Sequence, residues 1–477
     1  MSDPRPHIAV VGGGIAGLAA AHAVRRLAGG AVRISVFEGS DRIGGKLHAS
    51  EVAGLAVDEG AESMLARRPE GVALARTVGL GVDVVHPAVE GAQVATEDGL
   101  RPLPRRQLMG IPGDLRELAA TGLLSLPALL RLPLDHVLPR TRVDEDIAIG
   151  RYVRARLGSE VVDRMVEPLL GGVYAGHADE LSLDATVPQL SGAVRMERSL
   201  LKATRQVMGS ATRGGPVFAS LRGGMGALPD AVAAASGAEI RTGAMVRELR
   251  RLPGGRWRLV IGPTRSPETV EADGVIVAAP AAAASRLLRR TAPFAAAELA
   301  QIEYASVAIL TYAFPRSAVV SPLHGTGFLV PPRAGTTVKA ATFSSHKWGW
   351  LGHADPDTVI VRCSVGRHGD EADLQHADDE LAWLALDELH DLTGLAGAPI
   401  DTRVTRWGGG VPQYAVGHLR RVSRIHAAVA EQPGLAVCGA AYDGVGVPAC
   451  IASADAAARQ VMRAVAAGTQ WSHVEQR

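Results

Sequence analysis

Residues 7–46 read HIAVVGGGIAGLAAAHAVRRLAGGAVRISVFEGSDRIGGK, and this stretch decides the fold. An apolar run over 8–11 predicts a buried strand. The glycine cluster after it leads into an Ala- and Leu-rich segment, which predicts a helix over about 18–27. A second apolar run over 32–37 predicts another strand, which ends at Glu38. This order of strand, glycine turn, helix, strand and acid is the pattern of a dinucleotide-binding unit.

Individual residues of this pattern have distinct physical roles. Gly12 permits a tight turn, Gly14 lets the backbone approach a pyrophosphate, and Gly17 lets the helix pack closely on the strand. Free N–H groups at the helix N-terminus attract phosphate. The carboxylate of Glu38 is placed to accept a hydrogen bond from a ribose hydroxyl. A glycine turn without a ligand is the alternative, and the complete surrounding pattern argues against it.

Two further segments narrow the nature of the cofactor. Arg42-Ile-Gly-Gly-Lys follows Glu38 closely, and Asp58-Glu-Gly lies a little further on. The pair resembles segments of the flavoprotein family that includes monoamine oxidases, phytoene desaturases and protoporphyrinogen-type oxidases. In that family an E-x(3)-R-x-G-G-[RK] segment binds FAD and a D-x-G motif lies close by. The resemblance therefore implies FAD rather than NAD.

Composition sets the broad class of the protein. A chain of 477 residues is too long for one hydrophobic core and predicts two or three domains. An apolar content of 47% with 21% charged residues is typical of a globular protein rather than a disordered one. The formal net charge of +1 gives no reason to expect nucleic acid as a partner.

The cysteines and the apolar runs bear on the location of the protein. Cys363, Cys438 and Cys450 show neither metal-binding spacing nor even pairing, so we expect free thiols, no metal site and a cytoplasmic location. The N-terminus leads at once into a core strand, which is unlike a secretory signal. The uncharged run over residues 118–130 is too short to cross a bilayer. We expect no transmembrane segment and at most peripheral membrane contact.

The motifs lie at both ends and in the middle of the chain, which predicts a discontinuous cofactor domain. We expect an α/β, Rossmann-like FAD-binding domain from 1–80, 217–300 and 430–477. An α+β substrate-binding domain with an antiparallel sheet is expected from 81–105, 186–216 and 301–429. A mostly helical insertion is expected over 106–185. By the resemblance, the whole has a monoamine-oxidase-like architecture.

Two helical stretches have more than one interpretation. Residues 109–138 are rich in leucine and broken by prolines, so several short helices are expected. Buried packing between helices is the favoured interpretation, and contact with a membrane surface or a substrate pocket is the alternative. Arg195, Arg198, Lys202 and Arg205 have spacings that put all four on one helical face. Such a stripe is usually solvated surface, but beside a pocket it would attract carboxylates.

Five longer segments are similar to protoporphyrinogen and coproporphyrinogen oxidases, and they spread the resemblance over nearly the whole chain. This resemblance implies that the protein oxidises a porphyrinogen to a porphyrin, with O₂ as electron acceptor and release of hydrogen peroxide. The turn at Gly439-Ala-Ala-Tyr lacks the cysteine that bonds the flavin in monoamine oxidases, so FAD is expected to be non-covalent. The segments are ESMLARRPEG (62–71), EPLLGGVYAGHADELSL (167–183), RGGMGALPD (222–230), RWGGGVPQY (406–414) and CGAAYDGVGVPACI (438–451).

The resemblance favours coproporphyrinogen III, with four propionates, as substrate in haem biosynthesis. We expect no membrane anchor, and Arg67-Arg68 lies where relatives place Arg-Lys. Protoporphyrinogen IX, with two propionates, is the alternative. A more distant alternative is that the protein is a flavin amine oxidase or a carotenoid desaturase. A non-enzymatic alternative is a flavin-stabilised scaffold that delivers porphyrin to a chelatase, and a downstream ferrochelatase is a candidate partner.

The expected site residues fall into two groups, because hydride transfer to flavin N5 needs placement rather than a catalytic side chain. Candidates for the substrate pocket are Arg67, Arg68, Gly172, Tyr174, Gly176 and Lys347. Candidates for cofactor binding are Gly12, Gly14, Ile15, Ala16, Gly17, Glu38, Gly39, Arg42, Gly44, Gly45, Lys46, Gly60, Ala61, Glu62, Ser63, Val246, Trp407, Gly439, Gly446, Val447 and Ile451. By the resemblance, the backbone at Val246 faces the adenine.

Overall fold

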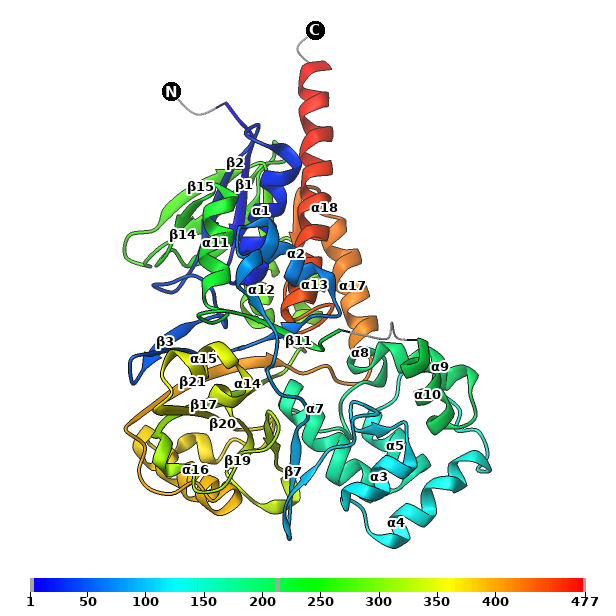
Figure 1. Ribbon diagram of the computed structural model, residues 1–477. Coiled ribbons are helices and arrows are strands. Elements are labelled where there is room, and N and C mark those ends of the chain that lie inside the picture. Colours follow the sequence, from blue (N-terminus) through cyan, green and yellow to red (C-terminus); the bar gives the residue numbers. More distant parts are fainter. Residues whose placement is uncertain (1–3, 144, 211–214, 475–477) are drawn as a thin grey trace.

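A computed structural model describes residues 4–143, 145–210 and 215–474 (Figure 1). Its upper part is built on a five-stranded parallel sheet whose strands come from three separate pieces of the chain. This confirms the predicted Rossmann-like class. In spatial order, the strands are β12 (Glu239–Arg241), β2 (Arg33–Phe37), β1 (His7–Val11), β16 (Gly274–Val277) and β22 (Leu435–Val437).

Both faces of this sheet are covered, which explains why its strands other than the edge strand β12 are largely apolar. One face packs on α1 (Ile15–Ala28), α11 (Ala227–Ser236) and α18 (Val447–Val474). The opposite face packs on a three-stranded meander and three helices. These are β13 (Val246–Arg251), β14 (Trp257–Ile261), β15 (Glu268–Ala272), α12 (Ala281–Leu288), α13 (Pro293–Ala300) and α17 (His418–Ala430).

The second sheet has seven strands and lies below the first (Figure 1). The helix α16 (Asp378–Thr393) covers one face through Leu381, Ala385 and Leu389, which recur every four residues. The expected antiparallel sheet is correct except at one pair, because β18 runs parallel to β7. The order is β21 (Asp401–Pro412), β17 (Tyr304–Pro315), β20 (Thr358–Val365), β19 (Val338–Thr342), β18 (Gly327–Leu329), β7 (Gln93–Thr96) and β8 (Gly99–Pro102).

A helical part lies beside the second sheet. It comprises α3 (Leu115–Thr121), α4 (Leu126–Arg131), α5 (Ile149–Leu157), α6 (Ser159–Val161), α7 (Glu167–Tyr174), α8 (Leu183–Thr186), α9 (Pro188–Met196) and α10 (Leu200–Ser210). Its core encloses an ion pair, since Arg156 Nε donates to Asp135 Oδ1 at 2.6 Å and both side chains are buried. No helix among the described residues is long and apolar enough to cross a membrane.

Two expectations concern this region. Residues 186–216 are expected in the substrate-binding domain, and within them Leu190, Val194 and Leu200 pack in the hydrophobic cluster that also holds the helical part. The predicted arginine stripe does not form, because α9 ends at Met196 and α10 begins at Leu200. Residues 211–214 of that predicted segment lie outside the described residues.

Short elements connect the three parts. A hairpin joins β3 (Ala49–Val52) and β4 (Leu55–Asp58), and a three-stranded ribbon contains β5 (Met64–Leu65), β11 (Phe218–Leu221) and β6 (Val84–Val85). The strands β9 (Gln107–Leu108) and β10 (Ile111–Pro112) form a small hairpin. The helices are α2 (Pro69–Thr77), α14 (Ser344–Lys347) and α15 (Gly349–Ala354).

Candidate active site

The turn between β1 and α1 has the geometry that a diphosphate needs. Gly12 has a φ of +109°, and a Cβ added there would lie 2.7 Å from Ala278 O. A Cβ at Gly17 would collide with Gly12 O, whereas a Cβ at Gly14 would meet nothing within 4 Å. Gly12 and Gly17 are therefore required by packing within the protein. Gly14 instead leaves open space at the helix N-terminus.

The charges around this turn suit a dinucleotide. Gly14 supplies no side-chain cap to α1, and the first turn of the helix contains no acidic residue, so its N–H groups are available to an anion. Glu38 Oε2 accepts a hydrogen bond from Gly13 N at 2.6 Å, which fixes the acid beside the turn. The fixed carboxylate lies where a ribose hydroxyl is expected.

The R-x-G-G-K segment packs directly on the glycine turn. Gly44 N donates to Gly13 O at 2.9 Å, and Gly14 and Gly44 form a parallel bridge. Burial lowers the pKa of Lys46, although its side chain is still exposed to solvent. The ammonium group is therefore surrounded by much protein and still reaches solvent.

The D-x-G segment reaches the same place. Ala61 N donates to Lys46 O at 3.1 Å, and Trp407 Nε1 donates to Glu59 O at 2.8 Å. A Cβ on Gly60 would collide with Lys46 O, which explains this glycine. Asp58 accepts hydrogen bonds from the backbone N–H groups of the RGGMG loop at Met225 and Gly226, and burial raises its pKa to about 6.

The C-terminal motif closes the arrangement. A Cβ on Gly439, after β22, would lie 3.7 Å from Ala16 Cβ on α1. The helix α18 then begins at Val447 without an acidic residue in its first turn, so it presents a second N-terminus. On the other side, the exposed Met245 contacts the Gly39 position, next to Val246. Segments from the start, middle and end of the chain therefore converge, and their glycines and free N–H groups fit FAD.

A buried charge cluster follows the D-x-G segment. Glu62 pairs with Lys347 on α14 and with Arg362 Nη1 on β20, the latter at 2.7 Å. Burial alone would raise the pKa of Glu62, but the two cations lower it to about 2. Arg362 also donates to Gly60 O at 2.9 Å. The predicted cofactor residue Glu62 and the predicted substrate residue Lys347 thus contact each other.

Arg67 and Arg68 follow β5, which begins two residues after Glu62. Arg67 is exposed, and Arg68 pairs with Glu70 at 2.8 Å. On the adjoining ladder Phe218 pairs with Leu65, and both side chains are about two-fifths exposed, at 41% and 42%. Lys347 Nζ lies 5.7 Å from the centre of the Phe218 ring. We call the surface of Leu65, Arg67, Arg68, Phe218 and Lys347 the ledge. It combines apolar and cationic groups, which suits an apolar ligand with carboxylates.

The helix α7 carries the remaining substrate candidates. Gly172 is exposed, whereas Tyr174 is buried with its ring centre 5.8 Å from that of Tyr414, and burial raises its pKa to about 12. A Cβ on Gly176 would collide with Gln413 Oε1, while Gln413 Nε2 donates to Tyr174 O at 2.7 Å. The GGVYAG and PQY motifs therefore pack against each other.

Sequence reasoning missed Arg362, Gln413 and Arg367. Arg362 and Arg367 are charged residues within or just after an otherwise apolar strand run, and both are buried. That signal was available, because a charge in a buried strand needs a partner. Arg367 Nη1 would lie 2.5 Å from a Cβ on Gly171, so it accounts for the first glycine of GGVYAG.

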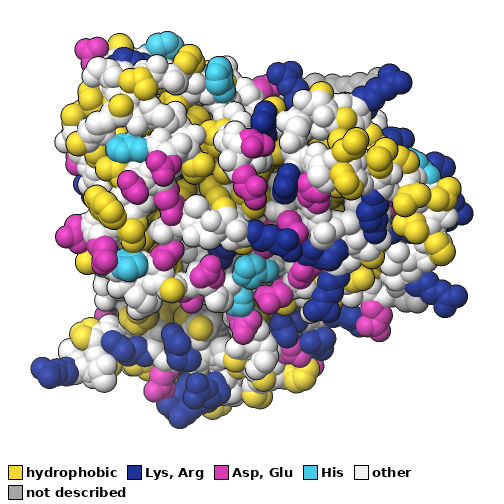
Figure 2. All heavy atoms as spheres, turned by 90° about the horizontal axis from the view of Figure 1, so that it is seen from below, with side chains coloured by type: hydrophobic (Ala, Val, Ile, Leu, Met, Phe, Trp, Pro, Cys, Tyr) yellow, Lys and Arg dark blue, Asp and Glu magenta, His cyan; other side chains and the backbone are white. Residues whose placement is uncertain are grey.

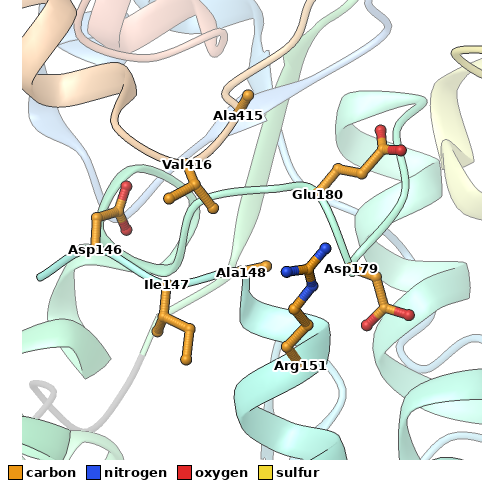
Figure 3. A pocket seen from close by; sticks show the side chains of 8 residues that line it. All are labelled: Asp146, Ile147, Ala148, Arg151, Asp179, Glu180, Ala415 and Val416. Atoms are coloured by element: carbon orange, nitrogen blue, oxygen red, sulfur yellow. The ribbon is translucent and has the colours of Figure 1, made fainter. Parts of the chain in front are cut away.

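A surface pocket of about 400 Å³ lies apart from these residues (Figure 3). It is formed between the start of α5, the loop after α7 and the linker after β21. Arg151 on α5 and Glu180 in the loop after α7 both line it. A neighbouring pocket of about 340 Å³ shares Asp146, which accepts a hydrogen bond from Gly417 N at 2.7 Å. Neither pocket is lined by a residue predicted for the substrate pocket or the cofactor, but Arg195 of the predicted arginine stripe lines the second.

The fold and the converging glycine turns define a flavin-dependent oxidoreductase of the monoamine-oxidase type. Residues 15–462 match the family described as flavin containing amine oxidoreductase. A cyclohexylamine oxidase from Brevibacterium oxydans shares the fold with a TM-score of 0.68 and 18% identity, covering 96% of this chain and all (100%) of that one. The chain belongs to this family of FAD-binding flavoproteins, which confirms the expected cofactor.

Within the family, near full-length relatives are named coproporphyrinogen III oxidase. The protein of Mycobacterium tuberculosis is 37% identical, covering 96% of this chain and 97% of that one. The Bacillus subtilis protein is 33% identical, covering 96% and 98%. A crystal structure from Exiguobacterium sp., provisionally assigned as a protoporphyrinogen oxidase, has a TM-score of 0.85 and 32% identity over 97% of this chain and 99% of that one. These findings confirm the resemblance that the sequence motifs indicated.

Proposed function

We propose that this protein oxidises coproporphyrinogen III to coproporphyrin III, with non-covalent FAD and with O₂ as the final acceptor. Hydrogen peroxide is the expected second product. The observation that carries the proposal is the 37% identity, over 96% of the chain, to a protein named for this activity. The ledge of apolar and cationic side chains beside the cofactor segments supports it, because the substrate is a large apolar ring with four propionates.

Bound FAD would supply the acceptor for a hydride from a meso carbon of the substrate. The chain's own residues would place both molecules. The N-terminus of α1 and Lys46 would hold the diphosphate, and Glu38 would hold the ribose. Glu62 stays ionised, because Lys347 and Arg362 depress its pKa, and it pairs with Arg362, which holds Gly60 O.

Arg67 is our first candidate for binding a propionate. It is exposed and forms no ion pair among the described residues, whereas Arg68 pairs with Glu70 and Lys347 pairs with Glu62. Lys347 and Arg68 would add positive potential at the same ledge. On the α7 side, Gly172 would leave room for the ring, and Tyr174 and Gly176 would support the wall through Tyr414 and Gln413.

Protoporphyrinogen IX is the second candidate substrate. A chloroplastic protoporphyrinogen oxidase from spinach is 26% identical, covering 95% of this chain and 83% of that one. Both substrates share the tetrapyrrole ring, so the number of carboxylates must distinguish them. Replacing Arg67 with alanine should raise KM for coproporphyrinogen more than for protoporphyrinogen, with a smaller change in kcat.

Anaerobic reduction of the bound flavin tests the proposal. Coproporphyrinogen III should bleach the visible flavin absorbance faster than protoporphyrinogen IX, and admission of O₂ should restore it with formation of peroxide. Faster bleaching by protoporphyrinogen would reverse the substrate assignment. Bleaching by amines or polyenes alone would indicate another oxidase class. Yellow protein that no porphyrinogen reduces would favour the scaffold that hands porphyrin to a chelatase.

The electron acceptor and the cellular location are parts of the same proposal. Peroxide formed in proportion to porphyrin would support O₂ as acceptor. The three cysteines are free and buried, which is compatible with the reducing cytoplasm in which we propose that the enzyme acts. Co-purification with a ferrochelatase, and its loss in high salt, would test the proposed downstream partner.

A further inference from the structure

The turn after β22 is held by two aromatic residues that follow β21. Tyr414 Oη donates to Ala440 O at 2.7 Å. His418 Nε2 lies 3.0 Å from Tyr442 O, and because a carbonyl oxygen can only accept, this ring nitrogen carries the hydrogen. Tyr442 N in turn donates to Gly439 O at 3.3 Å. Two carbonyl groups of this turn are therefore fixed by side chains from another part of the chain.

The rings of Tyr414 and His418 form one buried unit. Their centres lie 3.8 Å apart, and their planes are inclined by 16°. Burial raises the pKa of Tyr414 and lowers the pKa of His418 to about 4. His418 Nδ1 is buried without a hydrogen-bond partner among the described residues, so a second proton on this ring would be unpaired. Near pH 7 the phenol therefore stays protonated and the imidazole neutral, and each donates to its carbonyl.

Neither ring belongs to the solvent-exposed surface. Seen from below, that surface mixes cationic, acidic and hydrophobic side chains (Figure 2), whereas Tyr414 and His418 are at most 1% exposed. A solvated pair of aromatic residues would hold a backbone turn only loosely. Since these two are enclosed, their hydrogen bonds keep the turn in one orientation.

The hydrogen bond from Tyr414 sets the direction of the next N–H group. The peptide bonds of the described residues are trans, so the C=O of Ala440 and the N–H of Ala441 point in opposite directions. The Ala441 N–H therefore faces away from Tyr414. Ala441 is 3% exposed, and no described residue accepts a hydrogen bond from its N–H. Because buried N–H groups nearly always have an acceptor, this one indicates an acceptor outside the chain.

This turn lies where the cofactor segments meet the substrate candidates. On one side, a Cβ on Gly439 would lie 3.7 Å from Ala16 Cβ on α1. On the other side, the Tyr414 ring centre lies 5.8 Å from that of Tyr174, a candidate for the substrate pocket. Hydride transfer requires the substrate to lie against the flavin ring and not against the adenine. The part of FAD nearest this turn is therefore the isoalloxazine ring.

We propose that Tyr414 and His418 are positioning residues for FAD, which aim the Ala441 N–H at the isoalloxazine ring. A backbone donor stabilises this ring most when reduction has given it negative charge. The two side chains therefore raise the reduction potential of the bound flavin without contacting it. The choice of the ring over the rest of FAD rests on the proposed substrate pocket, whereas the potential is measured without any porphyrinogen.

Reductive titration of the FAD-loaded protein against a reference dye tests this role. Tyr414→Phe removes one hydroxyl and keeps the aromatic ring. We expect it to weaken the binding of reduced FAD at least tenfold relative to oxidised FAD, which lowers the two-electron midpoint potential by at least about 30 mV. His418→Phe should also lower the potential. His418→Gln, whose amide can still donate to Tyr442 O, should stay closer to wild type.

Tyr312→Phe is the matched control. The Tyr312 hydroxyl also donates to a backbone carbonyl, Ala382 O on α16 at 2.6 Å, and Tyr312 is buried in the core of the second sheet. Both tyrosine variants should lose similar stability in chemical denaturation, but Tyr312→Phe should keep the wild-type potential. Equal potentials in Tyr414→Phe and Tyr312→Phe would overturn the proposal. So would an equal loss of affinity for oxidised and reduced FAD. Anaerobic bleaching by porphyrinogens tests the substrate separately.

Discussion

At the scale of single residues, Glu62 is the strongest point of contact between the cofactor segments and the second sheet. Replacing it with glutamine leaves Lys347 and Arg362 buried without their counter-charge. We expect the free energy of unfolding to fall by about 3 kcal/mol, the usual cost of breaking a buried ion pair from one side. Chemical denaturation of wild type and Glu62→Gln measures it.

The surface pair between Arg68 and Glu70 provides the comparison, because its side chains are 42% and 28% exposed. Glu70→Gln should change stability by at most about 1 kcal/mol. Since the pKa of Glu62 lies near 2, its contribution should be complete above the ordinary pKa and be lost as pH falls from about 5 toward 2. Equal losses for both variants at neutral pH would contradict the buried role.

Asp58 should have the opposite dependence on pH. Burial raises its pKa in the folded state to about 6, above the ordinary value of 3.8, so the folded protein binds the extra proton between these values. Its contribution to stability is therefore present at low pH and should fall by about 3 kcal/mol as pH rises from about 4 through 6. Denaturation at several pH values should show this loss in wild type but not in Asp58→Asn.

At the scale of elements, the turn between β1 and α1 separates two uses of glycine. A Cβ at position 17 would collide with backbone, whereas a Cβ at position 14 would meet no protein atom. Gly17→Ala should therefore destabilise the protein without FAD. Gly14→Ala should keep that stability within about 1 kcal/mol, while raising the Kd for FAD at least tenfold. Calorimetry with FAD and denaturation without it measure the two effects, and equal FAD affinity in Gly14→Ala and wild type would contradict the phosphate role.

This turn was predictable because all of its determinants lie within 40 residues. The break between α9 and α10 was not. Ser199 Oγ and Leu201 N both donate to Asp135 Oδ2, at 2.6 and 2.9 Å, so an acid more than 60 residues away in sequence caps α10. The arginine spacing continues through this break, so it does not indicate that one helix ends and another begins. The Glu62–Arg362 pair joins residues 300 positions apart; the apolar run around Arg362 indicates that it needs a partner, but no local pattern identifies Glu62 as that partner.

At the scale of the whole molecule, the parallel sheet unites strands from three distant pieces of the chain. Its outline was predictable, because glycine motifs mark the first and last pieces. The core against which α9 and α10 pack was not predictable, since their apolar residues would suit either neighbouring core. Amphipathic helices specify that one face is buried, but they do not specify against which partner.

Removal of FAD should therefore affect the whole fold rather than one loop. The proposed contacts come from 12–46, 60–63 and 439–451, which are held together by the same central sheet. Free FAD at 100 times its Kd should stabilise the folded protein by about 2.7 kcal/mol, provided that the unfolded chain does not bind it. Thermal unfolding of protein stripped of FAD, before and after adding FAD back, should show one transition whose Tm rises with FAD concentration. Gly14→Ala should need more FAD for the same rise, and a Tm unaffected by saturating FAD would mean that these segments do not share one ligand.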